Sequence, residues 1–116
     1  MKQVEISINE RILAAVVVGQ HRGRLADARV LSRVLDKLQL ADDEKAAIGM
    51  EEFPTEDGVG VRWDPAKAAA QPPVVLSLEN DEAAKLLSCL SNWEGYTPAD
   101  AKRIGRVVEQ LQRQGD

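Results

Sequence analysis

The chain's single histidine and single cysteine, His21 and Cys89, are the residues whose chemistry could support covalent catalysis. A cysteine becomes an effective nucleophile only where a base or a positive charge favours its thiolate. Cys89 lies within an apolar helical pattern, between Leu87 and Leu90, whereas His21 lies in a polar stretch. The sequence therefore favours a core thiol and a loop histidine over a catalytic pair, and we expect no enzyme activity.

Metal and cofactor sites also lack their usual residue patterns. One histidine and one cysteine do not make a zinc ligand set. The carboxylates of Asp42, Asp43 and Glu44 lack the alternating oxygen ligands and the glycine of an EF-hand loop. No glycine-rich loop connects a strand to a helix as a phosphate site requires. We therefore expect neither a metal nor a cofactor.

A basic loop, residues 21–24, contains His21, Arg22 and Arg24 and could contact phosphate or an acidic partner. Arg29, Arg33 and Lys37 continue this basic face at helical spacing. Two other interpretations remain open. The loop could be a solvated turn between two helices, and the helical cations could pair with Asp36 or with the acidic middle segment of the same chain.

Two tryptophans are unusual in a chain whose apolar residues are mostly aliphatic, because tryptophan is enriched in binding hot spots. Trp93 closes the apolar stripe of a helix and is interpreted as a core residue. Trp63 stands at the end of an expected hairpin, so we expect it to be partly exposed. The candidate binding surface uses Trp63 and Tyr96 as aromatic anchors and His21, Arg22 and Arg24 as its charged part.

The charge of the chain, −4 overall, is unevenly distributed over its 116 residues. Residues 1–40 carry seven basic and four acidic side chains, and residues 41–60 carry one basic and seven acidic side chains. An acidic domain is a poor general binder of nucleic acid, because phosphate contacts dominate that affinity. The basic face at residues 22–37 leaves a nucleic-acid-binding regulator open as an alternative function.

The pattern of elements predicts one domain, residues 1–116, of the α+β class. Alternating apolar residues at 4–8 and 74–78 predict strands, and each strand leads into two helices. Between these units, residues 42–65 form an acidic insert with a hairpin that turns at residues 56–58. We expect a small sheet with helical hairpins packed on one face.

The two strand–helix–helix units, residues 4–38 and 74–111, resemble each other. Residues 26–38 (ADARVLSRVLDKL) and residues 99–111 (ADAKRIGRVVEQL) are identical at six of thirteen positions. The upstream halves align with a shift of two or three residues. Leu35 and Val108 are expected to be core residues at equivalent positions. Duplication explains the match, and convergence of two helices rich in alanine, leucine and valine is the alternative.

The layout resembles a group of small phage and prophage proteins of about this length. The resemblance lies in residues 10–13 (ERIL), in residues 43–45 (DEK) and in the pair Trp63-Asp64. It is diffuse, the loop at residues 21–24 departs from the pattern, and it carries over no functional residue. It implies a phage or prophage accessory protein with no established activity.

These observations together favour a non-enzymatic protein that binds a host or phage protein. Nucleic acid is a less favoured partner, and association with further copies of the chain is left open. No stretch of eighteen apolar residues occurs, so no membrane span is expected. The single cysteine and the absence of a signal-peptide pattern favour the cytoplasm of the host cell.

Overall fold

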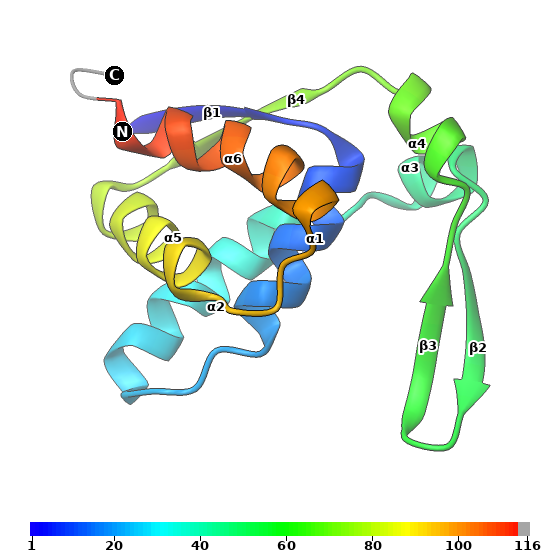
Figure 1. Ribbon diagram of the computed structural model, residues 1–116, viewed down its shortest axis with the longest axis horizontal. Helices are drawn as coiled ribbons and strands as arrows, with labels where there is room; N and C mark the ends of the chain where they lie inside the picture. The colour runs from blue at the N-terminus through cyan, green and yellow to red at the C-terminus, as the bar shows by residue number, and fades with distance from the viewer. Residues whose placement is uncertain (114–116) are drawn as a thin grey trace.

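The computed structural model describes residues 1–113, so the last three residues of the expected domain lie outside the described part. Six helices and four strands follow one another along this part of the chain (Figure 1). In order they are β1 (Lys2–Ile6), α1 (Ile8–Gly19), α2 (Leu25–Leu38), α3 (Asp42–Ala47), β2 (Glu51–Thr55), β3 (Gly58–Arg62), α4 (Pro65–Ala70), β4 (Val74–Leu78), α5 (Asn80–Asn92) and α6 (Pro98–Gln112).

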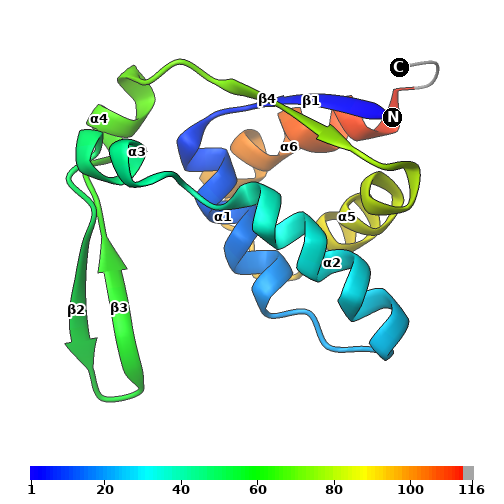
Figure 2. The same cartoon turned by 180° about the vertical axis from the view of Figure 1, so that it is seen from behind.

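Strands β1 and β4 form an antiparallel pair, and α1, α2, α5 and α6 all lie on one side of it (Figures 1 and 2). Alternation explains this one-sided packing, because successive strand residues point to opposite faces. Val4, Ile6 and Leu78 are buried against the helices, whereas Val75 on the other face is 58% exposed. The expected α+β fold, with helical hairpins on one face of a small sheet, is confirmed.

The elements of the two units correspond at a spacing of 72 residues. Strand β1 begins at Lys2 and β4 at Val74, and the helices that follow begin at Ile8 and Asn80. Before each helix, a backbone N–H donates to a glutamate three residues further on, Ser7 to Glu10 and Glu79 to Glu82. The match between the second helices has a spacing of 73, so the element bounds offset the two halves by one residue and not by the expected two or three.

The same relation extends to the polar contacts at the start of α1 and α5. Glu10 and Glu82, 72 residues apart, are both buried carboxylates. Glu10 Oε2 lies 3.3 Å from Nε of Arg106, and Glu82 Oε2 lies 3.5 Å from Nε of Arg33. Arg33 and Arg106 are one of the identical pairs of the sequence repeat. The first helix of each unit is thus joined to the second helix of the other unit by an arginine–glutamate pair.

Glu82 is the more heavily engaged of the two buried carboxylates. Lys37 Nζ lies 2.6 Å from its Oε1, and the backbone N–H of Glu79 donates to the same oxygen at 2.8 Å. Burial alone would raise the pKa of Glu82, but the hydrogen bonds from Lys37 and Glu79 and the charges of Lys37 and Arg33 outweigh it. The pKa of Glu82 is therefore lowered from its usual value of 4.5.

We expect acid to destabilise the fold partly through Glu82. Because its folded pKa is lowered, the contribution is present above pH 4.5 and is lost as the pH falls through the folded pKa. Urea unfolding between about pH 7 and about pH 3 measures this loss. In the Glu82→Gln variant the decline below pH 4.5 should be shallower than in the wild type. Identical slopes in the two proteins would contradict the assignment.

The core positions of the second helices follow the repeat, with one correction. Leu35 and Val108 occupy equivalent positions, but both are only partly buried. Leu25, at the start of α2, is 66% exposed. The buried face of α2 runs through Leu31, Val34 and Leu38, so Val34 and not Leu35 fills the core. The buried pairs at equivalent positions are Leu31 and Ile104, Val34 and Val107, and Leu38 and Leu111.

Local hydrogen bonds mark where the long helices begin. Ser7 caps α1, and its hydroxyl accepts the N–H of Glu10 at 3.2 Å. Thr97 caps α6 in the same way, because its hydroxyl accepts the N–H of Asp100 at 3.2 Å. Helix α5 begins at Asn80, directly after Glu79.

The insert between the two units comprises α3, the β2–β3 hairpin and α4. The hairpin turns at residues 56–57, and Gly58 takes a φ of +135° that favours glycine. After β3, Pro65 begins α4. Asp64 caps this helix by accepting the N–H groups of Ala66 and Lys67. The hairpin projects from the rest of the molecule as an arm (Figures 1 and 2).

Candidate functional site

His21 and Cys89 line the same small cavity, of about 210 Å³, between α1, α2 and α5. Cys89 Sγ donates to the carbonyl oxygen of Val17, and burial raises the pKa of its thiol. Asp27 is paired with Lys85, with 2.7 Å between its Oδ1 and Nζ. The cavity therefore favours the thiol form of Cys89, not a nucleophilic thiolate, and does not support the catalytic pair.

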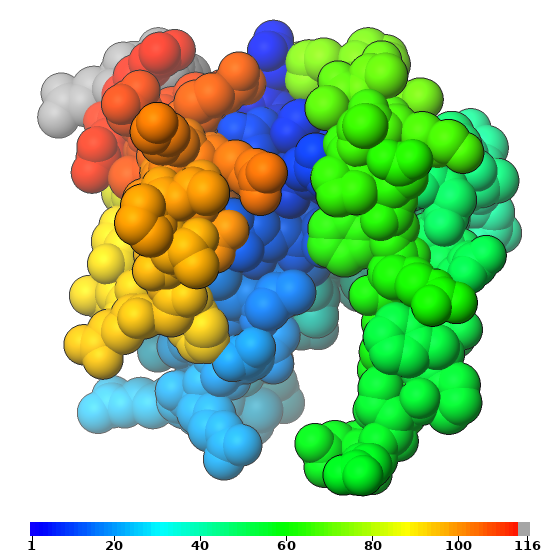
Figure 3. Space-filling model, turned by 45° about the vertical axis from the view of Figure 1, so that its right-hand side comes forward, coloured from blue at the N-terminus to red at the C-terminus, as the bar shows by residue number. Residues whose placement is uncertain are grey.

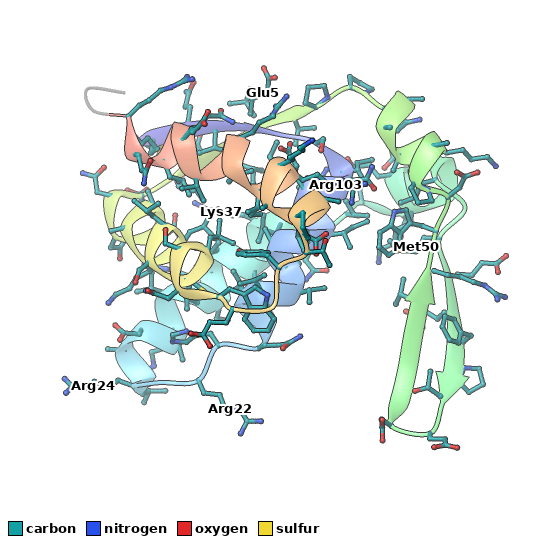
Figure 4. All side chains as sticks on the ribbon, viewed as in Figure 1. Glu5, Arg22, Arg24, Lys37, Met50 and Arg103 are labelled. Carbon is teal, nitrogen blue, oxygen red and sulfur yellow. The ribbon has the colours of Figure 1, made fainter. Side chains whose placement is uncertain are left out.

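The basic loop stands at the free end of the α1–α2 hairpin. His21, Arg22 and Arg24 are exposed there, and Arg22 and Arg24 point away from the body (Figure 4). The rest of the expected basic face is differently placed. Arg33 lies 2.6 Å from Asp81, and Lys37 binds the carboxylate of Glu82. The alternative of internal pairing holds for these two cations, but their acidic partners belong to α5 and not to the middle segment.

Tyr96 is hydrogen-bonded and packed within its own chain. Its hydroxyl donates to the carbonyl oxygen of Leu90 at 2.9 Å, and its ring packs against the main core. Burial, with smaller contributions from Cys89 and Asp100, raises the pKa of Tyr96 to about 12. A phenol held in this way braces the α5–α6 loop, so Tyr96 is poorly suited to anchor a partner.

Trp63 lies at the base of the hairpin and is partly buried, as expected. Its indole N–H donates to Oδ1 of Asn9 at 3.1 Å. Its ring packs against a second small core formed by Ile8, Ile48 and Ala68. Trp63 therefore attaches the insert to the start of α1, and its indole hydrogen bond is already used within the chain.

An ion pair strengthens this attachment. Arg11, whose side chain is 5% exposed, donates to both carboxylate oxygens of Glu44, at 2.6 and 3.0 Å, and to the carbonyl oxygen of Gln39. The hydrogen bond from Arg11 lowers the pKa of Glu44 against the opposing effect of burial. Bidentate pairs of this kind fix geometry as well as contributing energy. Arg11, Glu44 and Trp63 thus dock the insert on the start of α1.

A groove lies between this docked arm and the first helical hairpin. It has a volume of about 550 Å³ and runs between the hairpin on one side and α1 and α2 on the other. Figure 3 shows it as a hollow between the N-terminal third and the projecting arm, and Figure 4 places Met50 at the base of that arm. Most of its lining is apolar: Ile12, Ala15, Val16, Leu35, Leu38, Leu40, Met50, Val61 and Trp63.

Two valines on facing walls of the groove are about half exposed. Val16 of α1 is 48% exposed and Val61 of β3 is 45% exposed. Isolated exposed valines are ordinary, but apolar side chains gathered in a hollow mark an interaction site. The charged residues at the groove are Arg11, already paired, with Lys45 and Glu52 at its rim. The groove therefore suits an apolar segment of another chain.

The groove approaches the basic loop along α1. A smaller hollow of about 160 Å³ shares Leu35 with it and reaches His21. Trp63 contacts Asn9 at the start of α1, and His21 lies just beyond the end of the same helix. At 1.5 Å per residue, Asn9 and His21 are about 18 Å apart along the helix axis. The structure thus connects two of the five candidate residues, Trp63 and His21, through one surface and leaves Tyr96 elsewhere.

Sequence reasoning did not identify Val16, Leu35 or Met50 as site residues. One signal was available, the three consecutive valines at 16–18, because a helix buries only part of its circumference. Val17 and Val18 are buried, and Val16 is left facing the groove. Leu35 and Met50 carried no such signal, since their exposure depends on where the hairpin stands.

Two other features are absent from the described part of the chain. Among residues 1–113, no group of three or more histidine, cysteine, aspartate or glutamate side chains could hold a metal ion. Within the same residues, no helix is long and apolar enough to cross a membrane. No protein-family model, curated protein or solved structure matches this chain.

Proposed function

We propose that this chain is a non-enzymatic accessory protein that acts by binding another protein through the groove between the hairpin arm and α1–α2. The uncovered apolar lining of that groove, with Val16 and Val61 facing each other across it, carries the proposal. A phage or prophage origin rests on the resemblance of residues 10–13, 43–45 and 63–64 alone. The partner is then a host or phage protein that offers an apolar segment.

Two features support binding by shape. The body is joined by two buried carboxylates and their arginines, Glu10 with Arg106 and Glu82 with Arg33. The arm is attached at its base by the Arg11–Glu44 pair. The groove therefore lies between two parts that are each held by specific contacts, and a partner does not have to order them. Preorganisation of this kind reduces the entropic cost of association.

The basic 22–37 face gives less support to a nucleic-acid-binding regulator. Of its cations, Arg33 and Lys37 already bind carboxylates of α5, and Arg22, Arg24 and Arg29 are exposed. A mobility-shift assay with duplex DNA would test this alternative. Binding through several phosphates must weaken steeply with added salt, and a shift of that kind, abolished by charge reversal at Arg22 and Arg24, would favour nucleic acid over the groove.

The groove is tested by an aspartate placed in it and a matched aspartate placed outside it. Val16→Asp puts a charge among the apolar lining, and Val75→Asp makes the same change at another exposed valine, on the outer face of β4. Tagged wild-type protein and both variants are used to capture proteins from host lysate.

We expect proteins retained by the wild type and by Val75→Asp to be lost from Val16→Asp, because burying an unpaired charge opposes binding. Equal capture by all three proteins would contradict the proposal. Circular dichroism of each variant confirms that a loss reflects the surface and not unfolding.

A further inference from the structure

Strand β3 presents a free edge with hydrogen-bonding groups. The two-residue turn makes Thr55 and Gly58 a hydrogen-bonded pair, and such pairs alternate along an antiparallel ladder. Phe53 and Gly60 are therefore also a hydrogen-bonded pair, and Val59 and Val61 belong to the intervening pairs. The N–H and C=O groups of Val59 and Val61 consequently point away from β2, toward the outer edge of β3.

The two edges of the hairpin are differently protected. On β2, Pro54 pairs with Val59, so its position on the outer edge offers no N–H. Glu51 and Glu52 add charge to the same strand. Strand β3 has neither proline nor acidic residues, and its single charge is Arg62 at its end. Proline and charge are the means by which proteins block strand pairing, so β2 is blocked and β3 is open.

One face of the hairpin is also uncovered. Val59 is 68% exposed and Val61 is 45% exposed. Both lie on the same face of the hairpin, and Val61 lines the groove from that face. The opposite face is occupied, since Arg62 lies 5.3 Å from the centre of the Phe53 ring. A two-stranded hairpin is marginally stable alone in water, and additional strands stabilise it. The open edge and the apolar face thus both favour a third strand.

We infer that β3 pairs with β3 of a second copy of this chain, antiparallel and centred on Gly60, to give a four-stranded sheet. This inference rests on the proposed function and names the partner of the same groove. An antiparallel pair of identical strands is self-complementary, as a two-fold dimer requires. Strand β3 lies on the body side of the arm in both ribbon views (Figures 1 and 2), so the added hairpin enters the hollow.

The residues of β3 suit this pairing. Centring on Gly60 sets Val59 opposite Val61 of the second copy, so that each exchanges two backbone hydrogen bonds with its counterpart. Valine pairs directly across strands stabilise a sheet. The same register sets Arg62 opposite Gly58 of the second copy, beside the acidic turn residues Glu56 and Asp57. Arg62 already pairs with Glu51 of its own hairpin at 3.2 Å, but this pair is exposed, so the carboxylates of the second copy would extend it into a network at each end. An uncharged peptide offers no such carboxylates, which favours a second copy.

A pair of proline substitutions tests the inference. Val61→Pro removes an N–H from the open edge, and Glu52→Pro removes an N–H from the outer edge of β2 at the position paired with Val61. Neither N–H serves the β2–β3 ladder, so both variants keep the hairpin's own bonds. Sedimentation equilibrium measures the self-association of the wild type and of both variants.

We expect the wild type and Glu52→Pro to form dimers and Val61→Pro to sediment as a monomer. A wild type that stays monomeric at all concentrations, or equal dimerisation by both variants, would overturn the inference. Because a variant could lose its fold, amide hydrogen exchange of the wild type gives a second test: the Val59 amide should become protected as concentration rises. A Val59 amide that exchanges equally fast at low and high concentration would also overturn it.

Failure here is distinguishable from failure of the proposed function. A monomeric wild type whose captured proteins are still lost with Val16→Asp would leave the groove as a binding site for a different protein. Conversely, a dimer that is unaffected by Val16→Asp, together with capture that is equal for all variants, would keep the strand pairing and contradict the groove.

Discussion

Replacing Glu44 with alanine is expected to lower the free energy of unfolding by about 3–5 kcal/mol. The cost is large because Arg11 would lose its counter-ion and remain buried. Arg11 is 5% exposed, its Nε already has no hydrogen-bond partner within the described structure, and it would retain only the carbonyl of Gln39. A buried charge without its counter-ion costs more than the intact pair contributes. Equilibrium denaturation in urea measures the loss.

Two further variants make this prediction specific. Asp42→Ala removes another carboxylate from the first turn of α3, but Asp42 is exposed, so we expect a cost of at most about 1 kcal/mol from the helix dipole. Replacing both Arg11 and Glu44 with leucine removes the stranded charge and should recover much of the loss. A single Glu44→Ala variant as stable as Asp42→Ala would show that Arg11 does not depend on Glu44.

Leu38→Ala is the second change with a large expected effect, a loss of about 2–5 kcal/mol. Leu38 is 2% exposed at the end of α2, where it closes the main core, so truncation leaves a cavity that its neighbours cannot fill. Leu25→Ala makes the same change at the start of the same helix, where the side chain is 66% exposed. Surface changes of that kind cost about 0.5 kcal/mol or less. Equal losses at the two positions would mean that the orientation of α2 is wrong.

The body of the fold could be predicted from the sequence because its signals are local and repeated. Alternation at residues 4–8 and 74–78, and the match between 26–38 and 99–111, were sufficient for the sheet and the helical hairpins. The match also contained Arg33 and Arg106, which bind the buried carboxylates of Glu82 and Glu10. The rotation of α2 about its own axis was not predictable in the same way. Leu35 and Val34 are both apolar, and only the packing of neighbouring elements decides which of them is buried.

The candidate site was less predictable, because it depends on where the insert docks. Trp63 was identified through its residue type, and its partial burial was correctly expected. Its hydrogen bond to Asn9 joins residues 54 positions apart, and no local pattern indicates such a contact. Tyr96 was chosen as a candidate anchor because of its loop position, and its hydrogen bond to the carbonyl oxygen of Leu90 could not be read from the sequence. Duplication of the two units remains a prediction, supported by the matching order and spacing of their elements and by the Glu10–Arg106 and Glu82–Arg33 contacts.

Photo-crosslinking from within the groove tests the central claim most directly. A diazirine analogue of similar size is placed at Val16 in one protein and at Val75, the exposed valine of β4, in another. After irradiation in the host cell, we expect covalent adducts from position 16 and none from position 75, with an adduct of twice the chain's mass if the partner is a second copy. Equal adducts from both positions, or none from position 16, would contradict a binding groove between the arm and α1–α2.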